Sequence, residues 1–218
     1  MTMTTNINAN SLANGNDELE RYALEECVRR QRLDHYSSVL VIPADRCELA
    51  ARFAHCGARV MLGDDQSRQK SSEGRILAMG LNDVIRFAPL SLAALPEDLP
   101  GEPFDIVVVT HGLCNMPYDK ARTVIRQLLL KLRIGGKLFV SFLGLHSELG
   151  DGYSDREQPV SGRFAPLTAA IAAKYGIADK VCLYSERDLF MLLLEAGASV
   201  LRTMTTTYGN VKGVAVRV

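Results

Sequence analysis

Short apolar runs separated by helical segments constrain the fold of this chain more than any other feature of its sequence. Residues 39–42 and 106–109 consist only of Val, Leu and Ile. A strand that is apolar at every position is typical of parallel sheets, in which helices cover both faces. Between these runs, apolar residues recur at helical spacing, which predicts amphipathic helices. The sequence therefore predicts an α/β protein built around a parallel sheet.

The alternation continues along most of the chain and ends in a hairpin. We expect strands at 39–42, 59–63, 84–87, 104–109 and 137–142, and helices over 17–34, 45–55, 66–79, 118–132, 166–175 and 185–196. Two final β-rich segments, 199–207 and 211–218, flank Tyr208-Gly209-Asn210, whose Gly and Asn suit the positive-φ positions of a turn. This order predicts a doubly wound, mainly parallel, Rossmann-like sheet that ends in an antiparallel hairpin.

The expected domain organisation follows from where apolar residues are available. Residues 1–16 are rich in Thr and Asn and have nothing to bury, so we expect a disordered tail. The remainder, 17–218, contains no linker or internal repeat and is expected to form a single domain, with an N-terminal helix and a polar loop over 144–163. Loops of this length are uncommon in compact domains and are often functional.

Composition and charge disfavour several classes of function. The chain carries 25 basic and 25 acidic residues, whereas a nucleic-acid-binding surface needs an excess of Lys and Arg. No apolar run approaches the roughly 20 residues that cross a bilayer, so no membrane segment is expected. The five cysteines are widely spaced and form no CxxC pair. We therefore expect neither a disulfide framework nor a metal site, and we expect a reducing, cytoplasmic location.

The candidate site lies at the carboxyl ends of the strands, where a doubly wound sheet binds its ligands. That rule selects Pro43, Ala44 and Asp45 after the first strand, Asp64 and Asp65 after the second, Ser91 after the third and His111 after the fourth. Asp64 lies about twenty residues beyond the first strand, where a carboxylate can accept hydrogen bonds from both hydroxyls of a ribose. His111 is suited to proton transfer near neutral pH, or else it lines the cleft as a hydrogen-bonded side chain without a chemical role.

Four segments carry a family resemblance: Gly57–Asp64, Phe104–Val109, Leu129–Ser141 and Ser185–Ala198. The third contains the element Leu-x-x-Gly-Gly-x-Leu before the fifth strand. Together with the order of elements over 37–218, these segments resemble the class I S-adenosylmethionine-dependent methyltransferases. The resemblance implies S-adenosylmethionine as the cofactor, Asp64 as the ligand of its ribose, and residues after the fourth strand that face cofactor and substrate. It implies methyl transfer to a small-molecule acceptor.

The loop after the first strand departs from the pattern of that family. The family places glycines there so that the backbone can approach the cofactor, whereas this chain has Pro43, Asp45 and Cys47. Val41 replaces the usual acidic residue of the strand, and no acidic residue follows the third strand in Ala88–Ser91. A second hypothesis therefore stands beside the first: a methyltransferase-like protein that has lost the cofactor and serves as a binding or regulatory partner of another protein.

The sequence assigns no catalytic residue, because methyl transfer requires mainly that the acceptor lie in line with the methyl group and that water be excluded. In the 144–163 loop, His146, Tyr153 and Arg163 form a substrate lid in one interpretation and are solvated loop residues in the other. The broad apolar face of 189–194 is expected to pack in the core, and a homodimer surface is its alternative use.

Overall fold

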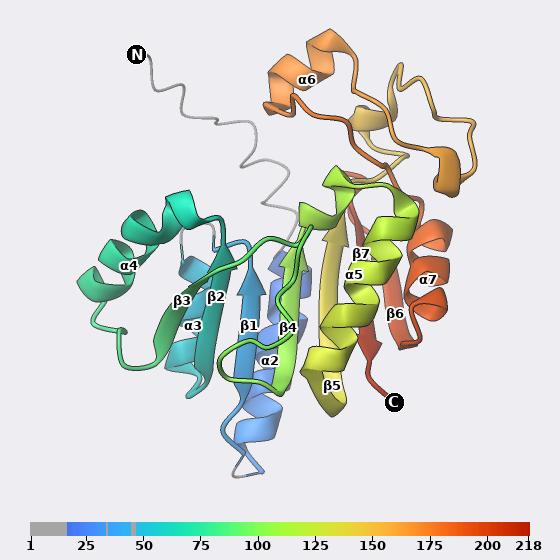
Figure 1. The fold of residues 1–218 in the computed structure, drawn as a ribbon. Helices are drawn as coiled ribbons and strands as arrows, with labels where there is room; N and C mark the ends of the chain where they lie inside the picture. The colour runs from blue at the N-terminus through green and yellow to red at the C-terminus, as the bar shows by residue number, and fades with distance from the viewer. Residues whose placement is uncertain (1–16, 34, 45–46) are drawn as a thin grey trace.

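A seven-stranded sheet with helices on both faces forms the centre of the protein (Figure 1). The computed structural model describes residues 17–33, 35–44 and 47–218. The strands are β1 (Ser38–Ile42), β2 (Arg59–Asp64), β3 (Ile85–Pro89), β4 (Phe104–Thr110), β5 (Leu132–Phe142), β6 (Ser199–Thr205) and β7 (Val211–Val216). Their order in the sheet is β3-β2-β1-β4-β5-β7-β6. Strands β1 to β5 are parallel and β7 is antiparallel to both of its neighbours, so the expected doubly wound sheet with a terminal hairpin is confirmed.

The helices divide between the two faces of the sheet. They are α2 (Asp17–Gln31), α3 (Glu48–His55), α4 (Gln69–Ala78), α5 (Tyr118–Lys131), α6 (Ala169–Tyr175) and α7 (Glu186–Glu195). Apolar residues of α2, α3 and α4 pack in one buried cluster, and those of α5 and α7 pack in the other. Helix α6 stands above the strand ends rather than against the sheet (Figure 1). Among the described residues, no helix is both long enough and apolar enough to cross a membrane.

The apolar run of β1 explains why both faces are covered. Val39 and Val41 belong to the cluster with α2 and α3, whereas Leu40 and Ile42 belong to the cluster with α5 and α7. Successive side chains of a strand point to opposite faces, so a strand in the middle of a two-sided core needs apolar residues at every position. All four side chains are at most 4% exposed.

Several elements have other boundaries than the sequence predicts, and three of these differences have a clear cause or change the element type. Strand β5 begins at Leu132, five residues earlier than expected, because Leu132 pairs with Phe104 before the register shifts. The helix expected over 66–79 is a short 3₁₀ turn, Gln66–Arg68, followed by α4. Helix α3 begins at Glu48, because the preceding Cys47 has a left-handed backbone with φ of 65°. The predictions for 1–16, Asp45 and Arg46 fall outside the described residues.

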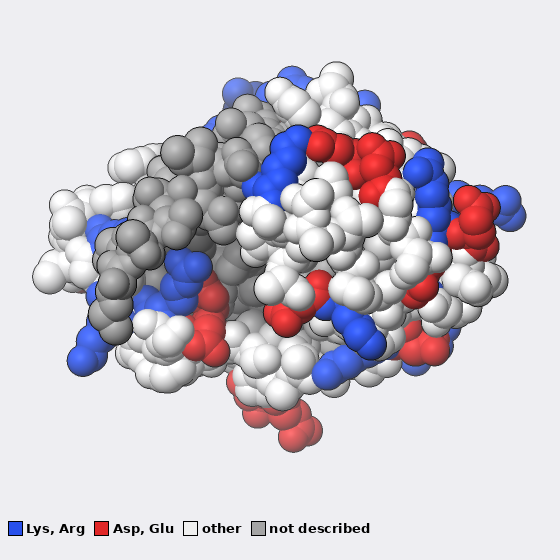
Figure 2. Space-filling view, turned by 90° about the horizontal axis from the view of Figure 1, so that it is seen from above, with Lys and Arg blue, Asp and Glu red and all other residues white. Residues whose placement is uncertain are grey.

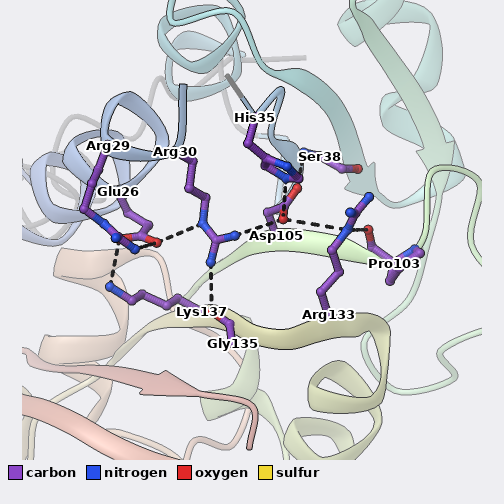
Figure 3. Close-up of polar contacts among 10 residues, drawn as sticks. All are labelled: Glu26, Arg29, Arg30, His35, Ser38, Pro103, Asp105, Arg133, Gly135 and Lys137. Carbon is purple, nitrogen blue, oxygen red and sulfur yellow. Dashed lines mark hydrogen bonds and ion pairs between the residues drawn. The ribbon is translucent and has the colours of Figure 1, made fainter. Parts of the chain in front are cut away.

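Helix α2 is tied to the sheet by a buried ionic network at the amino ends of β4 and β5 (Figure 3). Asp105 is fully buried and lies 3.0 Å from Nη1 of Arg30 and 2.9 Å from Nε2 of His35. Glu26 accepts hydrogen bonds from Arg29, from Arg30 and, at 2.8 Å, from Nζ of Lys137. The network therefore joins α2 to two central strands. Because hydrogen bonds are directional and apolar contacts are not, it also fixes the orientation of the helix.

Glu26 makes the stability of this attachment depend on pH. Burial alone would raise its pKa, but hydrogen bonds from Arg29, Lys137 and Arg30 hold the pKa of Glu26 at about 2. Because the folded-state pKa is below the ordinary value of 4.5, the carboxylate stabilises the protein fully above pH 4.5 and progressively less as the pH falls toward 2.

We expect Glu26→Gln to lower the free energy of unfolding at pH 7 by about 2 kcal/mol, because the three cations lose their buried carboxylate. Urea unfolding between pH 3 and pH 7 measures this difference. The difference in free energy of unfolding between the parent and Glu26→Gln should stay constant above pH 4.5 and become smaller below it. A difference that does not change with pH would show that the charge of Glu26 does not stabilise the fold.

Candidate functional site

A cavity of about 450 Å³ opens at the carboxyl edge of the sheet, where the strand order reverses between β1 and β4. Its walls come from the ends of β1, β2, β3 and β4, completed by Leu143 after β5 and by Tyr175 and Ile177 at α6. Five of the residues that the sequence selects line this cavity: Pro43, Asp64, Asp65, Ser91 and His111. Asp45 lies outside the described residues. The reversal of strand order places these separate loops around one space.

Asp64 ends β2 and presents a carboxylate at the cavity wall. Its Oδ2 accepts a hydrogen bond from the backbone N–H of Ala44 at 3.2 Å, and its Oδ1 accepts one from the N–H of Asp65 at 2.8 Å. These two amides orient the group. A carboxylate has about four lone-pair sites, so each oxygen can accept a further bond from a ligand hydroxyl.

Asp65 has a different local role from its neighbour. Its Oδ1 accepts the N–H of Ser67 at 2.9 Å and caps the 3₁₀ turn that follows. The hydrogen bonds from the side chain and backbone of Ser67 lower the pKa of Asp65. The two adjacent carboxylates are therefore held by different partners, and Asp64 is the one that lies between the loops after β1 and β2.

The loop after β1 contains no glycine, yet one of its residues, Cys47, has a backbone conformation that glycine favours. Cys47 is buried, and its φ of 65° is a conformation that favours glycine. Pro43 lines the cavity and has no N–H to offer a ligand. Ala44 is buried and gives its N–H to Asp64, so it contributes to the site through its backbone. The loop thus supports the carboxylate of β2 instead of presenting its described amides to the cavity.

The part of the cavity wall next to Asp64 is largely apolar, and the N–H of Leu90 donates to the carbonyl of Asp64 at 2.8 Å. Leu90 and Leu92 follow β3, with Ser91 between them, and Ile42 ends β1. Gly112 lets this wall approach β4, because a Cβ there would lie 2.6 Å from Cδ1 of Leu92. Apolar side chains together with a carboxylate suit a ligand that has a flat ring and a hydroxylated part.

His111 follows β4 and is held in one position. Its backbone has a left-handed φ of 56°, its N–H donates to the carbonyl of Ser141 at 2.9 Å, and its Nε2 lies 3.0 Å from Oγ of Ser141. Burial, and to a smaller extent the charge of Lys212, lowers the pKa of His111 to about 4. The imidazole is therefore neutral at pH 7, and so low a pKa makes it a weak general base.

The three residues proposed for a substrate lid do not come together. His146 is exposed and lines a second cavity. Tyr153 is buried and donates its hydroxyl to the carbonyl of Val181 at 2.6 Å. Arg163 is buried and donates to the carbonyl of Leu183 at 2.8 Å and to the carboxylate of Asp188 at 2.9 Å. Tyr153 and Arg163 thus hold the 144–163 segment to the body of the protein and do not line either cavity.

The second cavity, of about 420 Å³, begins where the first one ends. Tyr175 at the end of α6 lines both. Its hydroxyl donates to Oε2 of Glu148 at 2.6 Å, and Lys174 pairs with the other oxygen of the same carboxylate. The rest of the lining comes from 146–149, from Thr205 at the end of β6 and from 206–209 in the turn that follows.

Several residues that line the first cavity were not selected from the sequence, for different reasons. Asn115 and Leu143 lie close to strand ends, so the same positional rule, applied a few residues farther, selects them. Tyr175 and Ile177 are more than thirty residues beyond β5 and carry no positional signal. Among the residues described, no group of three His, Cys, Asp or Glu side chains is arranged to hold a metal ion.

The sequence matches no protein-family model and no curated protein, but the fold is shared with solved structures. PigF with SAH has a TM-score of 0.62 at 17% identity, over 89% of this chain and 61% of that one. The mitomycin 7-O-methyltransferase MmcR has a TM-score of 0.61 at 18% identity, over 90% of this chain and 54% of that one. The cyclase SpnF has a TM-score of 0.63 at 17% identity, over 91% of this chain and 81% of that one.

This chain therefore spans less than two thirds of the length of PigF and MmcR. Identities this low establish the fold alone. The conclusion is that this chain has the Rossmann-like fold of the S-adenosylmethionine-dependent methyltransferases.

Proposed function

We propose that this chain transfers a methyl group from S-adenosylmethionine to a small-molecule acceptor. The observation that carries the proposal is the position of Asp64, whose carboxylate lies at the wall of a cavity at the point where the strand order reverses. The cavity, at about 450 Å³, is of the size that small-molecule and cofactor sites have. Similarity to PigF with SAH and to a mitomycin O-methyltransferase supports this choice of cofactor and of acceptor class.

The residues present fit such a cofactor. Asp64 would hold the two ribose hydroxyls, because both of its oxygens keep lone pairs beyond those used by backbone amides. Leu90 and Leu92 would cover the flat base with apolar surface. When bound, S-adenosylmethionine supplies a methyl group on a positively charged sulfur. His111 is neutral at pH 7, so it would add no positive charge to the cavity that holds this cofactor. The chain's contribution is to bind, orient and exclude water.

A second candidate, a methyltransferase-like protein that binds a protein partner instead of the cofactor, has one observation in its favour. Pro43 has no N–H, and Ala44 gives its N–H to Asp64 instead of to the cavity. The described residues of the loop after β1 therefore offer a ligand fewer donors than glycines at the same positions would. The cyclase SpnF also illustrates that this fold supports a reaction other than methyl transfer.

Calorimetric titration with S-adenosylhomocysteine separates these candidates. The methyltransferase proposal expects binding with a dissociation constant in the micromolar range, with a matching rise in thermal stability. It also expects label from methyl-tritiated S-adenosylmethionine to enter small molecules of a protein-free cell extract. Absence of heat and of thermal shift at millimolar ligand would reject the proposal and favour the protein-binding candidate.

A further inference from the structure

The second cavity continues the first one along the same edge of the sheet. The first lies over the ends of β1 to β4, and the second is bounded by residues that follow β5 and by the turn between β6 and β7. Tyr175 is a wall of both cavities. A molecule in the second cavity would therefore adjoin the end of the first that lies beside Leu143 and Tyr175, away from Asp64.

Neutral hydroxyl groups dominate the wall of the second cavity. Ser147 uses its hydroxyl internally, since it donates to the carbonyl of Gly144 at 2.7 Å and accepts the N–H of Leu149 at 3.2 Å. Thr206 accepts the N–H of Asn210 at 3.1 Å and keeps its hydroxyl hydrogen for a ligand. Among the described residues, the side chains of Thr207, Tyr208 and His146 have no hydrogen-bond partner, and all three are exposed at the cavity.

The second cavity offers no net charge to a ligand. Among the described residues that line it, Glu148 has the one carboxylate, and that group is already paired with Lys174 and hydrogen-bonded to Tyr175. These two partners lower the pKa of Glu148, so the pair stays ionised and mutually compensated at neutral pH. Seen from above, acidic and basic side chains alternate in small groups on the described part of this face (Figure 2). A charged ligand would lose its hydration without gaining an opposite charge.

The two backbone segments that line the second cavity are in direct contact. A Cβ at Gly144 would overlap the carbonyl oxygen of Gly209, and a Cβ at Gly209 would lie 2.6 Å from the Cα of Ser147. Gly209 also has a φ of 82°, which a side chain disfavours. The turn between β6 and β7 is thereby seated on the segment after β5, and the hydroxyl groups of Thr206 and Tyr208 are presented from a fixed support.

We propose that this second cavity is the acceptor pocket and that it takes a neutral molecule with several hydroxyl groups, of the size and character of a single sugar ring. Hydroxyls both donate and accept, so a wall of Thr, Tyr and His side chains matches a ligand that does the same. The ring of Tyr208 adds an apolar face for the C–H surface of such a ligand. As an assignment of the acceptor, the proposal rests on the proposed function.

Saturation-transfer NMR with methyl β-D-glucopyranoside as the probe tests the pocket, both with and without millimolar S-adenosylhomocysteine. The double variant Thr207→Val/Tyr208→Ala removes two exposed hydroxyls and should not disturb folding. We expect it to weaken glucopyranoside binding by about tenfold, the loss expected for two neutral hydrogen bonds. Tyr36→Ala, which removes a tyrosine that is 77% exposed before β1, is the matched control and should change binding by less than about twofold.

Two comparisons decide the outcome. Glucuronate and glucosamine have the same ring with a negative or a positive charge, and both should bind more weakly than the neutral glucopyranoside. Tighter binding of either charged sugar, equal binding by the double variant, or no saturation transfer to the glucopyranoside would overturn the assignment. Binding of S-adenosylhomocysteine is measured separately by calorimetry. If the cofactor binds and the sugar does not, the assignment of the second cavity is wrong and the proposed function stands. If the sugar binds and the cofactor does not, methyl transfer is rejected and the second cavity remains a sugar-binding site.

Discussion

Replacing Asp64 by alanine should weaken binding of S-adenosylhomocysteine by about 100-fold, measured by calorimetry at pH 7. The carboxylate is expected to accept hydrogen bonds from two ribose hydroxyls, and charged hydrogen bonds contribute about 1.5–3 kcal/mol each. Asp64 also accepts the N–H groups of Ala44 and Asp65, so its loss unties the loop after β1 from the end of β2. We expect the cost to stability to be about 1–2 kcal/mol, which leaves the protein folded.

Two further variants make the Asp64 result interpretable. Asp64→Asn keeps one acceptor oxygen and the size of the side chain, so its affinity should fall between those of the parent and of Asp64→Ala. Asp83→Ala removes an exposed carboxylate that precedes β3, at the opposite edge of the sheet, and should leave affinity unchanged. If Asp64→Ala binds within about threefold of the parent, the ribose assignment is wrong.

Asp105→Ala should lower the free energy of unfolding by about 3–5 kcal/mol, because it removes the fully buried carboxylate that Arg30 shares with His35 and leaves Arg30 with Glu26 as its one ionic partner among the described residues. The carboxylate is fully buried, holds Arg30 and His35, and accepts the N–H of Ser38 at 2.9 Å. Urea unfolding at pH 7 measures the change. Helix α2 should also lose protection in hydrogen exchange before the central strands do, since the network is its ionic attachment to β4 and β5.

Asp119→Ala is the matched control for the ionic network. Asp119 pairs with Arg122 at 2.9 Å on the surface of α5, and its side chain is 70% exposed. Exposed pairs of this kind contribute about 0–1 kcal/mol. If Asp105→Ala lowers the free energy of unfolding by no more than Asp119→Ala does, apolar packing and not the ionic network holds α2 in place.

The fold could be predicted from the sequence because the central parts of β1 and β4, which are buried on both faces, are apolar at every position. Val39 to Ile42 and Ile106 to Val109 are apolar throughout, and this pattern is rare outside covered parallel sheets. The ends of elements were less accessible. Leu132 looks like the last turn of a helix, and only its pairing with Phe104 assigns it to β5.

The first cavity was also largely predictable from the sequence, since the ends of parallel strands meet at one edge of the sheet. Asp64, Ser91 and His111 all line it for that reason. The second cavity was not, because the segment that follows β5 returns to the strand ends by a path that no local pattern specifies. Tyr153 and Arg163 are the clearest example. Their polarity suggested that they are exposed, but both are buried and donate hydrogen bonds to backbone carbonyls. The acceptors, Val181 and Leu183, lie about twenty or more residues farther along the chain.

The contact between Gly144 and Gly209 limits how ligand preference in this protein can change. Since the two main chains touch, substitution at either position displaces the turn itself and costs stability before it alters selectivity. Variation at 146, 207 and 208 has no such penalty, because these side chains are exposed and project from an unaltered scaffold. A mutant library intended to redirect the protein toward new compounds should therefore randomise those three positions and keep both glycines.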